Sequence, residues 1–519
     1  MKKPQIQPGA PVHTVKGNAS HRAEQPPPNG VDTQWSIAVA TCLIAFFAVS
    51  THSNLGFFYV SFLEAFGTDR RNAAWPGSIY EIVGHLAGLL VAVMRRFFSV
   101  FQIGLAGSIV LWMGLLAAVF APDIPWMAVT FGLIHGIGVG VVLISITVAI
   151  MTHFDKYRGL AAGMKYTGNS LSSLVLPKVL SLLRSAYSMR GTMLIYAALC
   201  MNSTALMLFL RERRRPPSKV ITFGPQKNQP QIQRRRQQKQ DEQVVKNGTA
   251  VSDEAVTAQL CDRRHGSISN RPGGVANRRR GSIASSIGAE AGLTSLCSDE
   301  VECSERKKSG TAVLLTSPTF YALVMGALTV DYTVTVVHGT IVDYARDKGV
   351  DRATAELSMT YCAPAIFLGR LLLPLAADKG LIGRTSLAAV SLASMAASAL
   401  FLPHTTSFVG YVLAQVSLAL FLACLSTLKA VLAADNFGAD AVPVYYGANG
   451  VGLVPILLFN PLLTGYFRDT MGSYDNLFRL VAGLQLFTSL IYFGLAYKER
   501  RRNAAASSEI SCTAVTTAS

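Results

Sequence analysis

The stretch Tyr361–Gly380, which reads YCAPAIFLGRLLLPLAADKG, decides how the rest of the chain is interpreted. It is apolar and long enough to cross a bilayer, yet it contains Arg370. At 1.5 Å per residue, Arg370 lies roughly 12 Å from Asp378, inside a hydrocarbon layer about 30 Å thick. A charge near mid-membrane costs at least about 2.5–3.5 kcal/mol, so such residues face protein or a water-filled cavity. Arg370 is therefore a candidate substrate or ion site; the alternative is a structural arginine that binds carbonyl groups of a neighbouring helix.

The composition points to a membrane protein. Of the 519 residues, 50% are hydrophobic and only 15% are charged, against about 25% charged residues in soluble domains. The net charge of +17, taken alone, would indicate a nucleic acid partner, but 20 of the 47 Lys and Arg residues lie in one polar segment between Arg211 and Lys308. Such basic segments flank membrane helices on the cytoplasmic side. We therefore expect the lipid bilayer, and no nucleic acid, as the partner of the bulk of the chain.

Twelve apolar runs of spanning length fall into two groups of six, separated by about a hundred polar residues. They predict an all-α integral membrane protein with twelve transmembrane helices in two six-helix halves. Two similar halves resemble the architecture of the major facilitator superfamily, which places a site between the halves near the bilayer midplane. The runs span 36–63, 75–94, 98–120, 126–151, 159–182, 191–210, 316–341, 354–377, 385–402, 407–434, 444–466 and 476–497.

These runs divide the chain into five segments. The halves occupy 35–210 and 313–497, and 498–519 forms a C-terminal tail. The N-terminal arm (1–34) and the basic central loop (211–312) lack hydrophobic periodicity, which predicts disorder. Short loops and tails on the side of the N-terminus carry 14 Lys and Arg residues, against 8 on the other side. The positive-inside rule then places both termini in the cytosol.

Few polar side chains interrupt the apolar runs, and each must face protein or water. Lys165 and Lys429 lie within about 10 Å of the expected cytosolic helix ends, so they form either a second site or snorkelling side chains. No nucleophile–base pair, metal-ligand cluster or phosphate-binding loop is recognisable, so we expect neither an enzyme nor a cofactor. The candidate substrate-binding residues are Arg370, Asn54, Tyr166 and Asn169, and the candidates for ion coupling are Asp331, Glu81 and His85.

The fourth run contains three glycines at four-residue spacing, Gly132, Gly136 and Gly140. This spacing aligns them on one helix face, where a neighbouring helix can approach closely. The pattern predicts tight helix packing. We interpret His135, which lies beside them, as a hydrogen-bonded packing residue rather than a proton relay.

Several motifs resemble those of the monocarboxylate transporter family. The run HFDKYRGLAAGMKYTGNSL (153–171) is similar to the family's signature at helices 4 and 5, and YFRDTMGSYD (466–475) is similar to the end of its helix 11. Further similar segments are FLEAFGTDRRNAAWPGSI after the first helix and IVDYARDKGV before the eighth. The resemblance covers about 36–210 and 313–497.

The resemblance implies a twelve-helix secondary transporter of the plasma membrane. Family members carry lactate, pyruvate, ketone bodies, aromatic amino acids or related small acids, and several need a single-span immunoglobulin-like partner. The family's helix 8 arginine falls on Arg370. The aspartate of proton-coupled members is replaced by Ile366, and their helix 1 lysine by Gly56. These departures predict weak or no proton coupling.

Three functions compete at this point. The first is a carrier of a small organic acid that works by alternating access. The second is a facilitative carrier of an aromatic amino acid or another neutral or zwitterionic solute. The third is a nutrient sensor that transports nothing and signals through the central loop.

Overall fold

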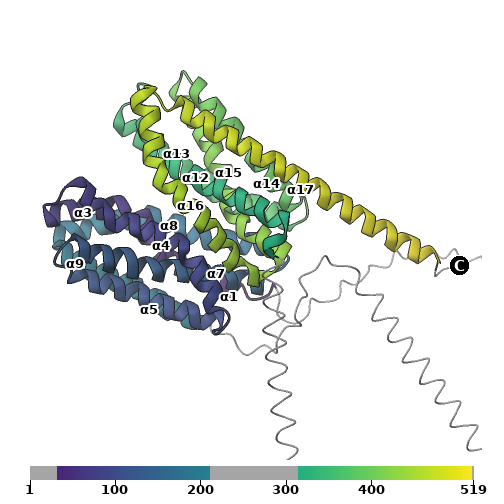
Figure 1. Cartoon of the computed structure of the whole chain (residues 1–519), viewed down its shortest axis with the longest axis horizontal. Helices are drawn as coiled ribbons and strands as arrows, with labels where there is room; N and C mark the ends of the chain where they lie inside the picture. The colour runs from purple at the N-terminus through teal and green to yellow at the C-terminus, as the bar shows by residue number, and fades with distance from the viewer. Residues whose placement is uncertain (1–31, 211–313, 517–519) are drawn as a thin grey trace, which may run out of the picture.

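The computed structural model describes residues 32–210 and 314–516, and within them regular structure is helical (Figure 1). Apart from residues 32–34, the arm and the central loop that we expect to be disordered lie outside the described residues. Figure 1 shows an N-terminal bundle, in purple to teal, packed against a C-terminal bundle, in green to yellow. The two-half architecture is therefore as predicted.

The N-terminal half contains six membrane crossings, and the first and the fourth are built from more than one helical piece. The fourth crossing contains a π-helical segment, η1, between two α-helices. The pieces are α1 (Trp35–Ala48), α2 (Ser50–Ser53), α3 (Leu55–Phe66), α4 (Arg70–Met94), α5 (Val100–Val119), α6 (Ile124–Met127), η1 (Ala128–His135), α7 (Gly136–His153), α8 (Arg158–Ala186) and α9 (Met189–Phe209).

The C-terminal half supplies six further crossings. Each corresponds to one of the predicted apolar runs, with ends that differ by a few residues except at the C-terminal end of the last helix. Its elements are α12 (Pro318–Asp347), α13 (Arg352–Asp378), α14 (Arg384–Phe401), η2 (Leu402–His404), α15 (Phe408–Phe437), η3 (Ala439–Ala441), α16 (Val442–Gly465), η4 (Tyr466–Thr470) and α17 (Asp475–Thr516).

Two crossings differ from the long apolar helices, one because it is interrupted and the other because it is less apolar. Ten helices in the described ranges are long and apolar enough to span a membrane unaided. The other two crossings are α1–α3 together, and α8. The first crossing is interrupted because the side chains of Ser50 and Asn54 bind main-chain carbonyl groups of Phe47 and Ser50, which competes with the helical hydrogen bonds. The pieces α1 and α3 are apolar but short, whereas α8 is long and contains polar residues such as Lys165, Asn169 and Ser170.

Each half has its own apolar core, and a third core joins them. One core lies within the N-terminal half around Phe131 and Tyr196, and another within the C-terminal half around Tyr344 and Phe478. The third combines residues of α7 and α8 with Ala430, Val431 and Ala434 of α15 and Val442 of α16. The halves are therefore packed directly against each other over part of their length.

Glycines bring helices into close contact, as their spacing predicts. A Cβ atom on Gly136 would lie 3.2 Å from the main-chain oxygen of Tyr80 on α4, and one on Gly132 would lie 2.9 Å from that of Pro76. Between the halves, a Cβ on Gly88 of α4 would overlap the main chain of Gly447 on α16. His135 is fully buried and contacts the Thr51 hydroxyl at 2.8 Å and the Leu111 carbonyl at 2.8 Å. Its predicted role in packing is confirmed.

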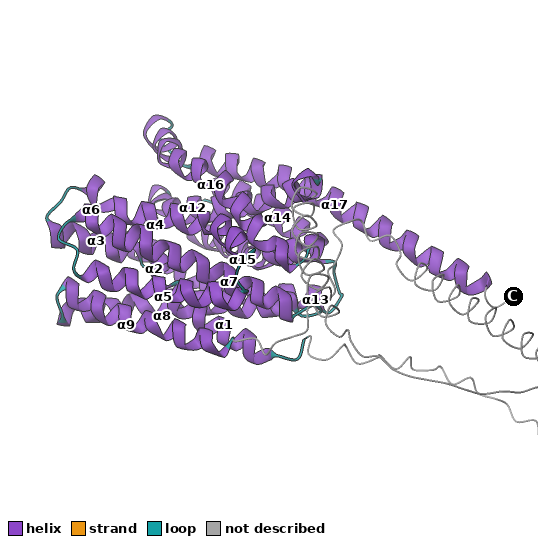
Figure 2. Cartoon of the chain, turned by 60° about the horizontal axis from the view of Figure 1, so that its bottom comes forward, coloured by secondary structure: helices purple, strands orange, loops and turns teal. Residues whose placement is uncertain are grey.

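The last helix is longer than its apolar run. We predict a crossing over 476–497, whereas α17 continues as one helix from Asp475 to Thr516. Figures 1 and 2 show it running along the C-terminal half and projecting beyond the bundle. The continuation contains Ala504, Ala505 and Ala506, and alanine is the best helix former.

Candidate functional site

Arg370 lies on α13 and faces α8 of the other half. Its Nη1 donates hydrogen bonds to the main-chain carbonyl of Tyr166 and to the hydroxyl of Ser170. The guanidinium carbon is 5.7 Å from the centroid of the Tyr166 ring. Among the described residues, Nε is buried without a hydrogen-bond partner, and no Asp or Glu forms an ion pair with the guanidinium. Arg370 thus has the carbonyl contact of a structural arginine, but it retains unused donors and an uncompensated charge.

Lys165 lies on α8 beside Tyr166 and is buried, with 4% of its surface exposed. Its Nζ donates to the Thr147 hydroxyl at 2.9 Å and lies 4.0 Å from the centroid of the Tyr166 ring. Because the ammonium is enclosed by protein, it does not snorkel in this conformation.

Lys429 on α15 has a dedicated counter-ion. Its Nζ is 2.6 Å from Oδ1 of Asp331 on α12, and Asn449 of α16 donates to Oδ2 of the same carboxylate at 2.8 Å. Asp331, which we expect to be a candidate for ion coupling, thus binds Lys429 and does not pair with Arg370. Lys429 is therefore neither a snorkelling side chain nor a free cation.

A second polar cluster surrounds Glu81 on α4. One carboxylate oxygen is 2.6 Å from Nδ1 of His52, and the other is 3.7 Å from Nε2 of His85. All three side chains are partly exposed. The structure thus brings together Glu81 and His85, two of the residues that we expect to be coupling candidates, and adds His52.

The remaining candidates are dispersed. Asn169 lies on α8 next to Ser170, and its Oδ1 is buried without a hydrogen-bond partner among the described residues. Asn54 is buried, and its amide donates at 2.7 Å to Ser50 of the same crossing, so it does not join the Arg370 cluster. Gly56 faces open space, since a Cβ there would meet nothing within 4 Å.

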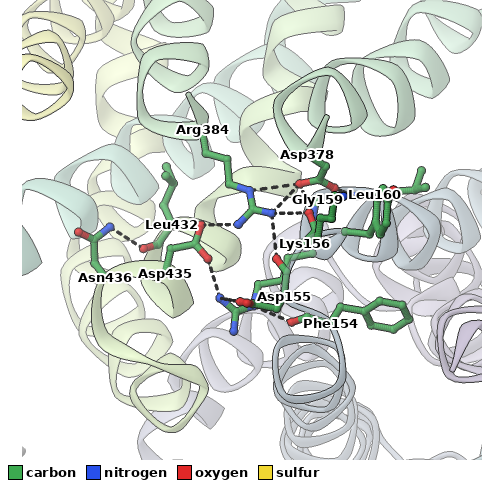
Figure 3. A network of polar contacts seen from close by, with 12 residues as sticks. Phe154, Asp155, Lys156, Gly159, Leu160, Asp378, Arg384, Leu432, Asp435 and Asn436 are labelled. Atoms are coloured by element: carbon green, nitrogen blue, oxygen red, sulfur yellow. Dashed lines mark hydrogen bonds and ion pairs between the residues drawn. The ribbon is translucent and has the colours of Figure 1, made fainter. Parts of the chain in front are cut away.

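Beyond the site, the halves are joined at one end of the bundle, which we call the bridged end (loops 95–99, 154–157, 379–383 and 438–441). Arg384 binds Asp378 and Asp435, each at 2.8 Å, and also donates to the main-chain carbonyls of Asp155 and Lys156 across the interface (Figure 3). Arg158 of α8 binds Asp435 at 2.7 Å. A network of charges from both halves therefore closes this end.

Two further contacts strengthen the bridged end. The Asp378 carboxylate accepts hydrogen bonds from the first main-chain N–H groups of α8, at Gly159 (3.3 Å) and Leu160 (2.8 Å), where the helix dipole favours a negative charge. Arg95 pairs with Asp440 of the other half. The sequence gives Arg95 no acidic partner in its own loop; the structure supplies one from the loop between α15 and α16.

The three central cations share one depth. Lys165, Arg370 and Lys429 are seven or eight residues from the bridged end of their helices, which corresponds to about 10–12 Å. In the described chain, the hydrogen bonds and ion pairs that join the halves lie between the loops of the bridged end and Ser170. The cations therefore form a layer, which we call the floor, close to where the hydrogen bonds and ion pairs between the halves end.

Comparison with known proteins identifies the family. Residues 41–329, more than half of the chain, match the family described as Major Facilitator Superfamily. The chain belongs to this superfamily. Solved structures agree on the fold: the proton:xylose symporter XylE superposes with a TM-score of 0.58 at 12% identity, covering 88% of this chain and 94% of XylE, and FucP with 0.53 at 13%, covering 88% and 98%.

Within the Major Facilitator Superfamily, the relatives are named monocarboxylate transporters. Monocarboxylate transporter 14 of Homo sapiens is 23% identical over 472 residues, 88% of this chain and 89% of the relative. Monocarboxylate transporter 9 of Gallus gallus is 28% identical over 185 residues, 36% of each chain. The match to the transporter 9 proteins thus spans only about a third of their length. The chain is a multi-pass membrane protein of the Major Facilitator Superfamily and is similar to these monocarboxylate transporters.

The sequence reveals some site residues of this superfamily member and not others. Four contacts are not predicted from the sequence: Thr147 accepts from Lys165, Ser170 accepts from Arg370, the Tyr446 hydroxyl contacts that of Tyr166, and Asn449 donates to Asp331. Hydroxyl and amide groups in apolar runs are common, so their residue type alone carries little signal. No sequence pattern links Thr147 to Lys165, because the two residues lie on different helices. Only the low hydropathy of α8 as a whole marks Ser170.

Proposed function

We propose that the chain is a secondary active or facilitative transporter that moves a small organic acid of the monocarboxylate type across the plasma membrane. The observation that carries this proposal is Arg370, a partly buried arginine between the halves with no acidic partner among the described residues. A guanidinium can bind a carboxylate through two parallel hydrogen bonds. Its unused Nε and Nη2 donors suit that geometry, because Nη1 alone binds Tyr166 and Ser170.

Transport would proceed by alternating access, in which the halves rock about the central site. We propose that the bridged end faces the cytosol, because the Lys and Arg excess lies on that side. The conformation described here is then the one that opens outward, with the three cations at the bottom of the entry path. Tags at residue 10, within 220–300 and at 510 should all be protected from protease in intact cells. Cleavage of the central loop in intact cells would overturn this orientation.

A second candidate substrate is an aromatic amino acid or another zwitterion. The observation that favours it is Glu81, a partly exposed carboxylate on α4 that could bind an ammonium group. A single-span immunoglobulin-like protein is a proposed partner for delivery to the cell surface. Co-expression with such a protein should raise the surface level without changing which solutes are taken up.

The direct test is uptake of a labelled panel into cells or proteoliposomes. The panel contains lactate, pyruvate, a ketone body, dicarboxylates, and phenylalanine or tyrosine. We expect uptake of at least one carboxylic acid, with severe loss in Arg370→Lys at unchanged surface expression. The matched control is Arg346→Lys, which alters an exposed arginine at the end of α12. Binding of a solute without accumulation or exchange would favour the sensor instead.

A further inference from the structure

The aromatic ring of Tyr166 lies close to two cations that come from different halves. Lys165 Nζ is 4.0 Å from the ring centroid, and the guanidinium carbon of Arg370 is 5.7 Å from it. The two positive groups are therefore within about 10 Å of each other, with one side chain covering both. The ring stabilises each cation weakly compared with an anion, because cation–π contacts supply only a fraction of a full ion pair.

Neither cation is compensated by an acid in the described part of the chain. Lys429, the third cation at this depth, has Asp331 at 2.6 Å. Glu81 is contacted by His52 and His85. The ammonium of Lys165 has three N–H donors, of which the Thr147 hydroxyl accepts one. The Thr147 hydroxyl itself donates to the Leu143 carbonyl at 2.6 Å, so it acts towards Lys165 only as an acceptor.

Arg370 and Lys165 together therefore carry two uncompensated positive charges, which is one more than a single carboxylate can neutralise. Charges inside a membrane protein are stable when they are paired with each other or with a ligand. A substrate with one carboxylate would pair with Arg370 and leave Lys165 uncompensated. A substrate with two acidic groups would pair with both.

We propose that the substrate carries two anionic groups, one bound by Arg370 and the other by Lys165, as in a small dicarboxylate. This inference rests on the proposed transport of an organic acid bound by Arg370, and it departs from the monocarboxylate type by adding a second anionic group. Tyr166 covers both cations, so its ring must rotate away as the substrate enters, and the substrate's anions replace the ring on each side. The Tyr166 hydroxyl, 3.4 Å from that of Tyr446, turns with the ring. Tyr166 is a positioning residue in this scheme.

The experiment compares acids of equal chain length that differ in one carboxylate, such as succinate with butyrate and malonate with propionate. Uptake into proteoliposomes is measured for wild type, Lys165→Met, Lys165→Arg and the control Lys178→Met. Lys178 lies on the same helix but is exposed near its other end. A second readout, thermal stabilisation of the purified protein by each acid, reports binding even where a variant does not transport.

We expect wild type to prefer the dicarboxylate about tenfold or more, the range for one hydrogen-bonded contact between charged groups. Lys165→Met should lose that preference in both readouts, whereas Lys165→Arg and Lys178→Met should retain it. Equal or greater use of the monocarboxylate by wild type, with a ratio unchanged in Lys165→Met, would overturn the inference while leaving the proposed function intact. The absence of uptake and binding for every acid would overturn both.

A further experiment asks whether the second anion is part of the organic substrate or is an inorganic ion. Monocarboxylate uptake is measured with chloride and with gluconate as the bulk anion. If uptake requires chloride, and Lys165→Met removes that requirement, then Lys165 binds an inorganic anion and the dicarboxylate proposal is wrong. Dicarboxylate uptake that is independent of chloride supports the proposal.

Discussion

The two ends of the helix bundle are held together in different ways. At the bridged end, ion pairs and hydrogen bonds cross between the halves, through Arg384, Arg158 and Asp378. At the opposite end, the ion pairs connect residues of the same half, as Arg184 does with Glu64 and Arg468 with Asp347.

This difference shows what rocking of the halves must change. Opening the bridged end requires contacts between the halves to break, whereas the ion pairs at the opposite end can move with the half that contains them. The energetic cost of changing conformation is therefore concentrated at the bridged end. The same comparison separates residues whose loss alters the conformational equilibrium from residues whose loss alters local stability.

The largest effect is expected for Arg384→Ala at the bridged end. Its partner Asp378 has a fully buried side chain, and removal of one member of a buried pair costs about 3–5 kcal/mol. We expect a lower melting temperature and greater alkylation of a cysteine introduced at Ala161, which is buried in the core that joins the halves. Unchanged alkylation and stability would show that the network does not hold this end closed.

Arg370→Lys should slow transport by a factor that corresponds to about 2–3 kcal/mol, which is the free energy of one hydrogen-bonded contact to a charged group. An ammonium cannot reproduce the two parallel hydrogen bonds of a guanidinium. Arg370→Ala should be equally or more severe, while both variants reach the surface. Full transport by either would make Arg370 a packing residue that binds the Tyr166 carbonyl.

Arg468→Ala at the opposite end should have a small effect. The pair with Asp347, at 2.5 Å, has an arginine that is about one-third exposed, and exposed pairs contribute about 0.2–1 kcal/mol. We expect transport close to wild type and unchanged alkylation at position 161. A loss as large as that of Arg384→Ala would remove the distinction between the two ends.

The smallest effect is expected for an imposed pH gradient. With Ile366 and Gly56 in place of the family's aspartate and lysine, uptake should change by about twofold or less, which is about 0.4 kcal/mol. Steep uphill accumulation driven by an inward proton gradient, and insensitive to Glu81→Gln and Asp331→Asn, would contradict this expectation. If Glu81→Gln alone removed the dependence of uptake on pH, proton binding would occur in the cluster of Glu81, His52 and His85.

The twelve crossings and the central position of Arg370 could be predicted because hydropathy reports burial in lipid and residue counting reports depth. The partners of the cations could not. Depth does not specify the direction in which a side chain points around its helix, so the pairing of Lys429 with Asp331 rather than of Arg370 with Asp331 required the packed structure. Loop residues such as Asp440 gave no signal, because a charge near a helix end is common whether or not it bridges the halves.

The length of α17 has a consequence for observing this protein at work. Its last 19 residues, from Lys498 to Thr516, extend about 28 Å at the rise of an α-helix. Because this segment is continuous with the C-terminal half, each degree by which that half tilts moves the end of α17 by about 0.5 Å. A fluorophore near its end, paired with one on the loop 154–157, would register the cycle of a working carrier as a change in distance without any label near the substrate.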